Sequence, residues 1–423
     1  MIDPRLFREQ PDFVKAQIAK LNTVAPVDEL IAADAERRSL LAETENLKAE
    51  RNRVSKLIGA MRDPAQREPL IADMKKVGER ISELDALVRA VEERLTRLQL
   101  EIPNLPHESV PVGPDESHNV IHPQVGALRA FDFTPLAHWE LGPALGIMDF
   151  ERGIKIHGAR GYVLMGQGAR LERALINWFL DLHTGEHSYQ EVLPPFLVRE
   201  EAAYGSAHLP KFRDTMYYDA EGNLFLVPTA EMPVTNLHRE EILNLDVLPL
   251  KYVAWTPCFR REKMSAGRDV RGLKRVHQFD KVEMYKFTTP ETSYAELETL
   301  VQDATEVARR LEIPYRLNEM CTGDLGFAAT KKYDVELWAP GSNEWLEVSS
   351  CSNCEAFQAR RANIRFRRKQ GGATEFVHTL NGSGLAVGRT MIALLETYQR
   401  KDGTVEIPEV LQRYMGTDVI KAA

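Results

Sequence analysis

A hydroxyl and a carboxylate two residues apart begin the part of the chain that could do chemistry. Thr229 and Glu231 close a short apolar run that reads as a strand. Because residues two apart on a strand point to the same face, this pair could hold an ammonium group together with a small polar substituent. The same spacing suits a polar strand edge that faces solvent, so the pair alone does not decide between a ligand site and a surface.

A strand, a basic loop and a second strand follow between residues 258 and 283. Arg260 and Glu262 share a face at the end of the first strand, and Phe279 and Glu283 share a face of the second. Arginine at the base of such a hairpin suits a bidentate grip on phosphate, whereas an arginine–glutamate ladder on the surface is the alternative. The loop carries four basic residues against one acid: Lys263, Arg268, Arg271, Lys274 and Asp269.

A third stretch combines oxygen ligands with the start of a helix. Glu347 and Ser350 offer the hard oxygen atoms that Mg²⁺ prefers. Small residues from Asn381 to Gly388 then precede a helix whose first turn holds Arg389. We expect the glycines of this segment to let the backbone approach a ligand closely. Arg389 would add a fixed positive charge, and the helix N-terminus favours anions through its dipole.

The elements that must position these residues predict an α+β fold with an antiparallel sheet. Past residue 120 the strands arrive as neighbours and do not alternate with helices, which favours antiparallel pairing. Neither GxGxxG nor GxxxxGK followed by Ser or Thr occurs, so we expect neither a Rossmann nor a P-loop nucleotide site. The predicted strands are 189–193, 224–228, 251–259, 275–287, 334–338, 345–350 and 375–380, and the predicted helices are 169–184, 291–311 and 384–399.

The segment 28–99 predicts a long antiparallel helical hairpin. Apolar residues recur every seven positions in its second half, with another apolar stripe between them, which is the left-handed coiled-coil pattern. We expect the helices to break between 62 and 69, where Pro64 and Pro69 interrupt helical hydrogen bonding. Helices of about thirty residues reach roughly 50 Å, so the hairpin should project as an arm. The main stripe consists of Leu70, Val77, Leu84, Val91 and Leu98.

The first helix of this arm carries a local excess of positive charge. Four clustered basic residues and Arg62 stand against the single acid Glu50. Such a patch is an electrostatic footprint for phosphates, although a dimerisation coiled coil with a solvated charged face explains the arm equally well. The four clustered residues are Lys48, Arg51, Arg53 and Lys56.

Length and composition set the outer limits. The 423 residues suggest two or three domains, and a core of this size needs no disulfide or metal. The net charge of −8 excludes a histone-like protein, although base is concentrated at 48–62, 263–275 and 360–369. Four cysteines with one CxxC pair do not predict structural zinc. No apolar run approaches the roughly 18 residues of a membrane helix and no hydrophobic leader is evident, so we expect a cytoplasmic protein.

The order of three short motifs resembles that of the class II aminoacyl-tRNA synthetases. The motifs are Glu191-Val192-Leu193-Pro194-Pro195, Phe259-Arg260-x-Glu262 and Gly384-x-x-x-Gly388-Arg389. Longer stretches narrow the resemblance to the bacterial-type seryl-tRNA synthetases, and it runs nearly end to end, including the arm. Those stretches are Ile102–His107, Pro228–Glu231, Gly267–Leu273, His277–Glu283, Gln358–Arg361 and Leu380–Gly384.

The resemblance implies two domains. The N-terminal domain, residues 1–105, would bind tRNA through the arm at about 28–99. The catalytic domain, residues 106–423, would be built on an antiparallel sheet flanked by helices. The helix 169–184 and the strand up to Pro195 resemble the family's dimer interface. Motif 1 would span about 169–198, motif 2 about 251–287 and motif 3 about 380–399.

The activity that the resemblance implies is ATP-dependent ligation of serine to tRNA. The first step would give seryl-adenylate and pyrophosphate, and the second would pass the seryl group to the 3′ end of the tRNA. Serine tRNA is the implied partner, with selenocysteine tRNA as a further one where the source has it. The family's homodimer would let the arm of one subunit reach tRNA on the other.

By the same resemblance, individual residues take roles in binding. Serine would be held by Thr229, Glu231, Arg260, Glu283, Asn381 and Ser383. ATP would be held by Arg260, Glu262, Val276, Phe279, Glu347, Val348, Ser349, Ser350 and Arg389. Mg²⁺ would be held by Glu347 and Ser350. The tRNA would meet Lys48, Arg51, Arg53, Lys56, Lys263, Arg268 and Arg271.

One departure from the family pattern lies in the loop of motif 2. Lys263 and Met264 stand where the family has small residues, and they add charge and bulk. We interpret this as a variant loop, because Arg260, Glu283 and Arg389 remain. Two other classes compete with this interpretation. One is a catalytically altered paralogue that acts as an RNA-binding protein, and the other is a relative that aminoacylates a carrier protein, although such relatives lack the long arm.

Overall fold

The computed structural model describes residues 1–263 and 271–422. The chain forms two compact units. The N-terminal unit consists of residues 2–18 and 24–103. The larger unit consists of residue 1, residues 19–23 and residues 104–423.

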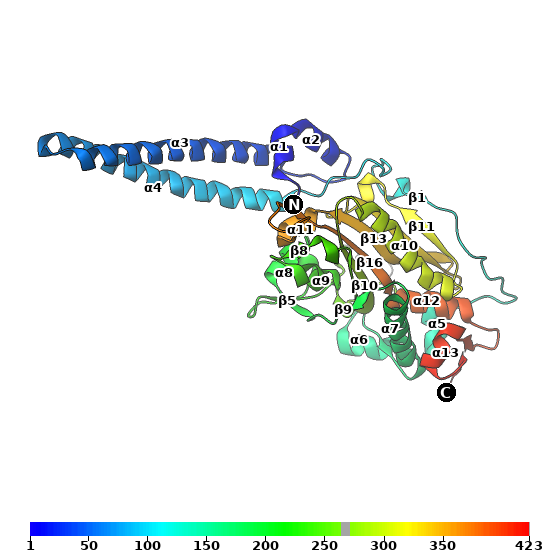
Figure 1. Cartoon of the computed structure of the whole chain (residues 1–423). Helices are drawn as coiled ribbons and strands as arrows, with labels where there is room; N and C mark the ends of the chain where they lie inside the picture. The colour runs from blue at the N-terminus through cyan, green and yellow to red at the C-terminus, as the bar shows by residue number, and fades with distance from the viewer. Residues whose placement is uncertain (264–270, 423) are drawn as a thin grey trace. The chain divides into compact units, whose positions relative to one another are not determined.

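A pair of long helices makes up most of the N-terminal unit. Helix α3 (Val27–Ala60) and helix α4 (Pro64–Glu101) lie side by side (Figure 1). The predicted stripes are buried between Ile81 and Leu95 of α4 and partly buried beyond these residues, which agrees with the coiled-coil pattern. Two short helices, α1 (Pro4–Glu9) and α2 (Pro11–Ala19), precede the pair. The buried stripe residues of α4 are Ile81, Leu84, Val88, Val91 and Leu95.

Two polar residues of α3 have partners within the N-terminal unit. Arg37 pairs with Glu92 of α4 at 2.8 Å, and the buried Thr44 hydroxyl donates to its own helix. The predicted break over residues 62–69 is wrong, because only residues 61–63 are non-helical. Pro64 takes the first helical position, where its missing N–H costs nothing, and Pro69 lies inside α4.

An eight-stranded sheet forms the centre of the larger unit. Its strand order is β1-β11-β12-β13-β16-β10-β9-β4. Neighbouring strands are antiparallel except for β4 and β9, which confirms the predicted antiparallel sheet. The strands are β1 (Val120–Ile121), β4 (Gln190–Glu191), β9 (Leu250–Phe259), β10 (Gln278–Thr288), β11 (Tyr315–Glu319), β12 (Lys331–Ala339), β13 (Glu344–Glu355) and β16 (His378–Ala386).

The two faces of this sheet serve different purposes. On β10, Val282 and Met284 join the main hydrophobic core, whereas Lys281 and Glu283 point to the opposite face. The helices of that core confirm the three predicted helices to within three residues at each end (Figure 1). They are α7 (Gln167–Gly185), α10 (Ser293–Arg310) and α12 (Val387–Tyr398).

Smaller sheets and short helices complete the larger unit. The small sheets have the orders β15-β14-β8, β5-β7-β6, β2-β3 and β17-β18. Their strands are β2 (Met148–Asp149), β3 (Val163–Leu164), β5 (Leu197–Arg199), β6 (Tyr218–Asp219), β7 (Leu224–Leu226), β8 (Ile242–Asn244), β14 (Arg365–Arg367), β15 (Thr374–Phe376), β17 (Val405–Glu406) and β18 (Val419–Ile420). The short helices are α5 (His138–Ala144), α6 (Phe150–His157), α8 (Glu200–Gly205), α9 (Glu231–Thr235), α11 (Phe357–Ala362) and α13 (Glu409–Met415). None of the helices in the described part of the chain has the length and apolar character that a membrane crossing requires.

Several sequence-based strand assignments are wrong. The predicted strand 275–287 begins only at Gln278, and the predicted strand 375–380 is divided between β15 and β16. Two further errors lie next to the candidate site. Strand β7 ends at Leu226 and α9 begins at Glu231, so Thr229 and Glu231 are not two apart on a strand. A proline at 228 offers no N–H to a neighbouring strand. Strand β9 ends at Phe259, so Arg260 and Glu262 also lie beyond their strand. Glu262 has a φ of +47°, which no strand residue adopts.

Candidate active site

A pocket of about 420 Å³ opens on the face of the sheet opposite the main core. Strands β10, β13 and β16 contribute its floor, and the loop before α9 and the first turn of α12 contribute to its rim. Every residue that the resemblance assigned to serine or to ATP lines this one pocket. Contacts among these side chains divide the pocket into a buried end and an open end.

A closed hydrogen-bonded cluster forms the buried end. The Lys281 ammonium donates to the Thr229 hydroxyl at 2.8 Å and forms an ion pair with Glu283. The Thr229 hydroxyl in turn donates to Glu283 Oε2 at 3.3 Å. Glu283 is 1% exposed, and its Oε1 has no hydrogen-bond partner among the described residues. A buried carboxylate oxygen without a partner is the natural acceptor for a cationic ligand.

A second carboxylate lies beside this cluster. Glu231 Oε1 accepts a hydrogen bond of 2.6 Å from the side chain of Gln358, and its backbone N–H donates to Thr229. Burial, together with the nearby charge of Glu283, raises the pKa of Glu231 to about 7. Two carboxylates therefore face one ammonium, Lys281, and the buried end has an excess of acid.

Arginines line the open end of the pocket. The Arg260 guanidinium lies over the ring of Phe279 at 5.1 Å from its centre, and its Nε donates to the carbonyl of Pro228. Arg275 bonds Glu262 at 3.4 Å. Positive charge next to an aromatic ring suits a ligand that combines a flat base with phosphates.

A β-bulge brings the two predicted metal ligands to one face. Glu347 and Ser350 are three apart, so on a regular strand they would point to opposite faces. The register of β12 and β13 shifts between Val335 and Glu336, which leaves one extra residue in β13 at Val348. This extra residue reverses the alternation, and both predicted ligands line the pocket.

The charge of Glu347 is maintained by its neighbours. Desolvation by the surrounding protein opposes ionisation of this half-exposed side chain, but the guanidinium of Arg389, with further cations, holds the pKa of Glu347 below its ordinary value. Arg389 Nη1 also donates to the Glu347 carbonyl at 2.6 Å. Val348 and Ser349 are buried, and the Ser349 hydroxyl is used in a bond to the Ser383 carbonyl, so these two residues offer the pocket mainly backbone.

The sequence predicted that the glycines of motif 3 let the backbone approach a ligand. This is not true of all of them. A Cβ on Gly384 would lie 2.5 Å from Nε2 of His183, and one on Gly382 would lie 2.9 Å from Cys351. These two glycines make room for the protein's own core. Gly388 differs, because a Cβ there would meet no atom within 4 Å.

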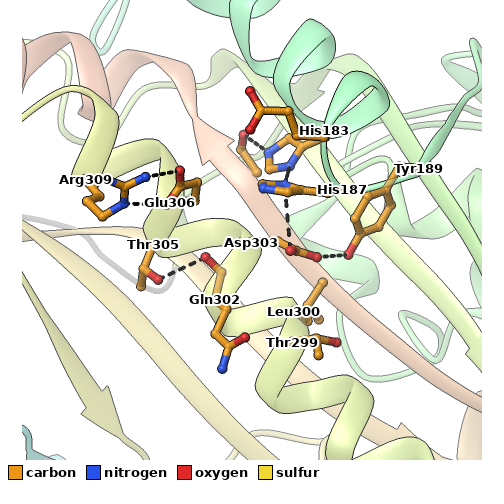
Figure 2. Close-up of polar contacts among 12 residues, drawn as sticks. His183, His187, Tyr189, Thr299, Leu300, Gln302, Asp303, Thr305, Glu306 and Arg309 are labelled. Carbon is orange, nitrogen blue, oxygen red and sulfur yellow. Dashed lines mark hydrogen bonds and ion pairs between the residues drawn. The ribbon is translucent and has the colours of Figure 1, made fainter.

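A chain of polar side chains links His183, His187, Asp303 and Tyr189 (Figure 2). The ring of His183 donates from Nε2 to the Gly384 carbonyl, and its Nδ1 contacts Nδ1 of His187 at 2.9 Å. Asp303 follows and accepts the Tyr189 hydroxyl at 2.9 Å. Burial lowers the pKa of His183 to about 3, so the ring is neutral. Strand β16, which carries Ser383, is thus hydrogen-bonded to His183 of α7 through the carbonyl of Gly384.

None of the described residues predicted to meet tRNA lines this pocket. Lys48, Arg51, Arg53 and Lys56 belong to α3 in the N-terminal unit. Lys48 is paired with Asp85 of α4 at 2.9 Å, whereas Arg53 and Lys56 are exposed. In the larger unit, Lys263 and Arg271 are exposed. Arg268 and Met264 lie outside the described residues.

Comparisons with known proteins agree with this arrangement. Residues 1–106 match the family model for the seryl-tRNA synthetase N-terminal domain, and residues 214–398 match that for the tRNA synthetase class II core domain (G, H, P, S and T). A serine–tRNA ligase of Roseiflexus sp. strain RS-1 is 63% identical over 417 residues, which cover 98% of each chain.

The chain belongs to the seryl-tRNA synthetase family. It is an ATP-dependent ligase that joins serine to tRNA. Two solved structures are similar over essentially their whole length. The seryl-tRNA synthetase of Pyrococcus horikoshii complexed with ATP is 39% identical, with a TM-score of 0.95 and full coverage of both chains. The cytoplasmic serine–tRNA ligase of Naegleria fowleri in complex with AMP is 32% identical, with a TM-score of 0.89 and coverage of 100% and 99%.

Several residues of the synthetase pocket were missed by the sequence interpretation. Lys281 could have been found, because it shares the strand face of Phe279 and Glu283. Gln358 had no local signal, since only the fold brings α11 beside Glu231. The missed residues that line the pocket include His208, Lys274, Arg275, Lys281, Lys332 and Ser352.

The basic stretch 360–369 of the synthetase is not a free cationic patch. Burial lowers the pKa of Arg361 to about 10, and its guanidinium lies over the ring of Phe357. Arg368 forms ion pairs with Glu291 and Glu375. Glu375 lies just beyond this stretch and Glu291 lies far from it in sequence, so a charge count over residues 360–369 alone misses both acids.

Proposed function

We propose that the pocket binds serine at its buried end and ATP at its open end, and joins them as seryl-adenylate. The observation that carries this proposal is the buried Glu283 carboxylate, whose Oε1 has no partner among the described residues at the buried end. An amino acid offers the ammonium group that this oxygen and Glu231 lack. Similarity to a seryl-tRNA synthetase complexed with ATP supports the assignment of the open end to the nucleotide.

The reaction needs no covalent bond to the protein. The serine carboxylate attacks the α-phosphorus of ATP, the bond to the β-phosphate oxygen breaks, and pyrophosphate leaves. The arginines at the open end neutralise charge that builds on the phosphates. The buried end holds the ammonium group of serine and thereby orients the attacking carboxylate. Arg260 is the group for the α-phosphate, and Arg389 is the group for the distal phosphates. In the second step the tRNA hydroxyl attacks the seryl carbonyl and AMP leaves.

Selection of serine depends on the residues of the buried end that would contact the serine hydroxyl. Thr229, Ser383 and Asn381 offer polar groups that line the pocket. Alanine would leave such groups without partners, which a closed site rejects strongly. Threonine carries the hydroxyl, so crowding must exclude its methyl group.

The residues at the open end fit a magnesium ion. Glu347 and Ser350 share one face, and the pKa of Glu347 is held low, so its carboxylate is ionised. Asp334, which pairs with Ser350 in the sheet, has a buried carboxylate oxygen that accepts no hydrogen bond from the described residues and lies 3.9 Å from the Lys332 ammonium. Bound there with ATP, Mg²⁺ would supply Lewis-acid polarisation of the phosphates. Replacement of Glu347 should raise the Mg²⁺ concentration needed for half-maximal activation, without loss of thermal stability.

The N-terminal domain, residues 1–105, is proposed to bind tRNA and the catalytic domain, residues 106–423, to carry the chemistry. Basic residues on α3 and at 263 and 271, together with Arg268, would meet the phosphates of serine tRNA. Selenocysteine tRNA is a further substrate where it exists. We also propose a cytoplasmic homodimer, joined through α7 and the strand up to Pro195, in which each arm serves tRNA held by the other subunit.

Serine-dependent exchange of pyrophosphate into ATP tests the first step directly. The purified full-length protein with Mg²⁺, ATP and labelled pyrophosphate should exchange label with serine and not with alanine. A folded protein without serine-dependent exchange would contradict the proposed chemistry.

Deletion of residues 28–99 tests the division of labour. Adenylate formation should remain within a few-fold of the full chain, whereas charging of serine tRNA should be lost. Equal loss of both activities in a folded deletion variant would contradict the separate role of the arm. The oligomeric state of both proteins is measured in parallel, since the dimer is proposed to form through the catalytic domain.

A further inference from the structure

The segment that returns from the motif 2 loop, residues 271–276, is held by side chains and not by regular secondary structure. Leu273, Lys274, Arg275 and Val276 of this return segment line the open end of the pocket. Their backbone must find hydrogen-bond partners elsewhere, because the segment forms neither strand nor helix.

Three side chains from distant parts of the sequence supply these partners. Arg389 Nε donates to the Lys274 carbonyl at 3.2 Å, and Arg160 donates to the Arg275 carbonyl at 2.9 Å. The Leu273 N–H donates to Nε2 of His138 at 3.1 Å. The last bond differs from the other two, because here the return segment is the donor and the acceptor is a fully buried ring.

The ring of His138 can accept this bond in only one tautomer. Its Nδ1 lies 2.9 Å from Oε1 of Glu396 in α12, which is also fully buried. Burial alone would raise the pKa of Glu396, but hydrogen bonds from His138 and Ser342 hold that pKa below its ordinary value, so Glu396 is a carboxylate. A carboxylate accepts and does not donate, so the ring proton lies on Nδ1 and Nε2 keeps a free lone pair.

The contact between ring and return segment is close enough to be specific. Gly272 has a φ of +67°, and a Cβ there would lie 2.0 Å from Nε2 of His138. Leu273 itself is 4% exposed and belongs to the main core. The other end of α12 carries Arg389, so one helix reaches the return segment twice, directly through Arg389 and through the Glu396–His138 pair.

We propose that His138, fixed by Glu396, is a positioning residue for the nucleotide end of the pocket. It holds the backbone at Leu273 and thereby sets where Lys274, Arg275 and Val276 meet ATP. This role rests on the proposed function, because it takes the open end as the ATP site. Neither His138 nor Glu396 lines the pocket, so neither is a catalytic residue.

A matched pair of substitutions separates this role from a merely structural one. In His138→Gln the terminal amide reaches the place of Nε2 and can accept from the Leu273 N–H. In His138→Asn the shorter amide reaches the place of Nδ1 and keeps only the bond to Glu396. Loss of one buried hydrogen bond corresponds to roughly a fivefold effect. We therefore expect His138→Asn to raise the KM for ATP about fivefold in pyrophosphate exchange, with the KM for serine unchanged and His138→Gln close to the parent.

Hydrogen exchange provides a readout independent of activity. The amide of Leu273 should lose protection in His138→Asn and keep it in His138→Gln, measured by mass spectrometry on the full-length protein without ATP. His118→Gln serves as a control at an exposed histidine. The parent protein is assayed first, so that a failure of the proposed function appears as absent exchange before any variant is compared.

A third variant covers the case in which both His138 variants unfold. Gly272→Ala leaves His138 and Glu396 in place and forces the return segment away from the ring. We expect the same selective rise in the KM for ATP, together with a lower melting temperature, because the added Cβ meets a buried ring and the residue has a positive φ. The proposal is overturned if His138→Asn or Gly272→Ala leaves the KM for ATP and the Leu273 protection unchanged. It is equally overturned if both His138 variants raise the KM for ATP and for serine alike.

Discussion

The two ends of the pocket differ in how their charges are paired. At the buried end, Lys281, Glu283 and the Thr229 hydroxyl bond one another. At the open end, Arg260 and Arg389 have backbone carbonyls among their partners and lie within reach of solvent. Removal of one side chain from such a cluster costs stability, because it leaves the polar group of another member buried without that partner. An exposed arginine can change partners at little cost, so the open end can accept and release a highly charged nucleotide.

This difference suggests which property each end controls. The buried end is organised before any ligand arrives, which suits discrimination between small amino acids that differ by one hydroxyl or one methyl group. The open end relies on a return segment that other elements hold in place. Selection of the amino acid and placement of the phosphates are therefore separable, and substitutions at the two ends should fail in different ways.

The largest contrast is expected from one chemical change made at both ends. Glu283→Gln removes the direct ion-pair partner of the buried Lys281 ammonium and leaves Glu231 as the remaining nearby carboxylate, so it should lower the free energy of unfolding by about 3 kcal/mol. Glu347→Gln makes the same change at a half-exposed side chain, where an ion pair contributes less than about 1 kcal/mol. Thermal or denaturant unfolding of the full-length variants measures both values.

Activity completes this comparison. Both variants should lose serine-dependent exchange, Glu283→Gln by roughly a hundredfold, which corresponds to a lost hydrogen bond to a charged group. The contrast between the ends breaks down if the two variants unfold at the same denaturant concentration.

The next effect is a pH dependence confined to the buried end. Burial and the charge of Glu283 raise the pKa of Glu231 to about 7, so the free synthetase binds a proton there as the pH falls through 7. An ammonium group prefers the ionised form, so the KM for serine should rise about tenfold per pH unit below 7. The KM for ATP should change less over the same range.

The same shift also affects stability. The folded state holds the Glu231 proton more tightly than the unfolded state, so this contribution to stability is full below the unfolded pKa and is lost as the pH rises through 7. Kinetics between pH 6 and pH 8 test the first statement, with Glu231→Gln as the variant that should remove the pH dependence of serine binding. A constant KM for serine over this range would disprove the raised pKa.

Patterns that depend on neighbours in sequence were predicted well. The seven-residue apolar repeat predicted α3 and α4. The two-residue alternation of a strand predicted that Phe279 and Glu283 share a face of β10. These patterns arise because a helix or a strand presents its residues at a fixed period, whatever surrounds it. The predicted break between the two helices was too long because a proline is tolerated at the first position of a helix, and α4 therefore begins at Pro64.

Features that depend on a second element could not be predicted in this way. The bulge at Val348 is defined only by the register between β12 and β13, yet it decides that Glu347 and Ser350 meet. The prediction of a strand at Thr229 and Glu231 was wrong. Both residues nevertheless line the pocket, because Glu231 begins α9 and Thr229 accepts a hydrogen bond from Lys281. Single residues such as these carry no periodic signal, and their partners lie tens of residues away.

The smallest effect concerns the two glycines that flank the change from strand to helix in motif 3. Gly384 adjoins the ring of His183 inside the protein, so Gly384→Ala should destabilise the fold by about 1–3 kcal/mol through overpacking. Gly388 faces open space at the pocket, and it lies in the first turn of α12. Gly388→Ala should therefore raise the free energy of unfolding by up to about 1 kcal/mol, because alanine restricts the unfolded chain and favours the helix. Its KM for ATP should rise if phosphates approach the backbone there, and equal melting temperatures for the two variants would show that both glycines serve the same purpose.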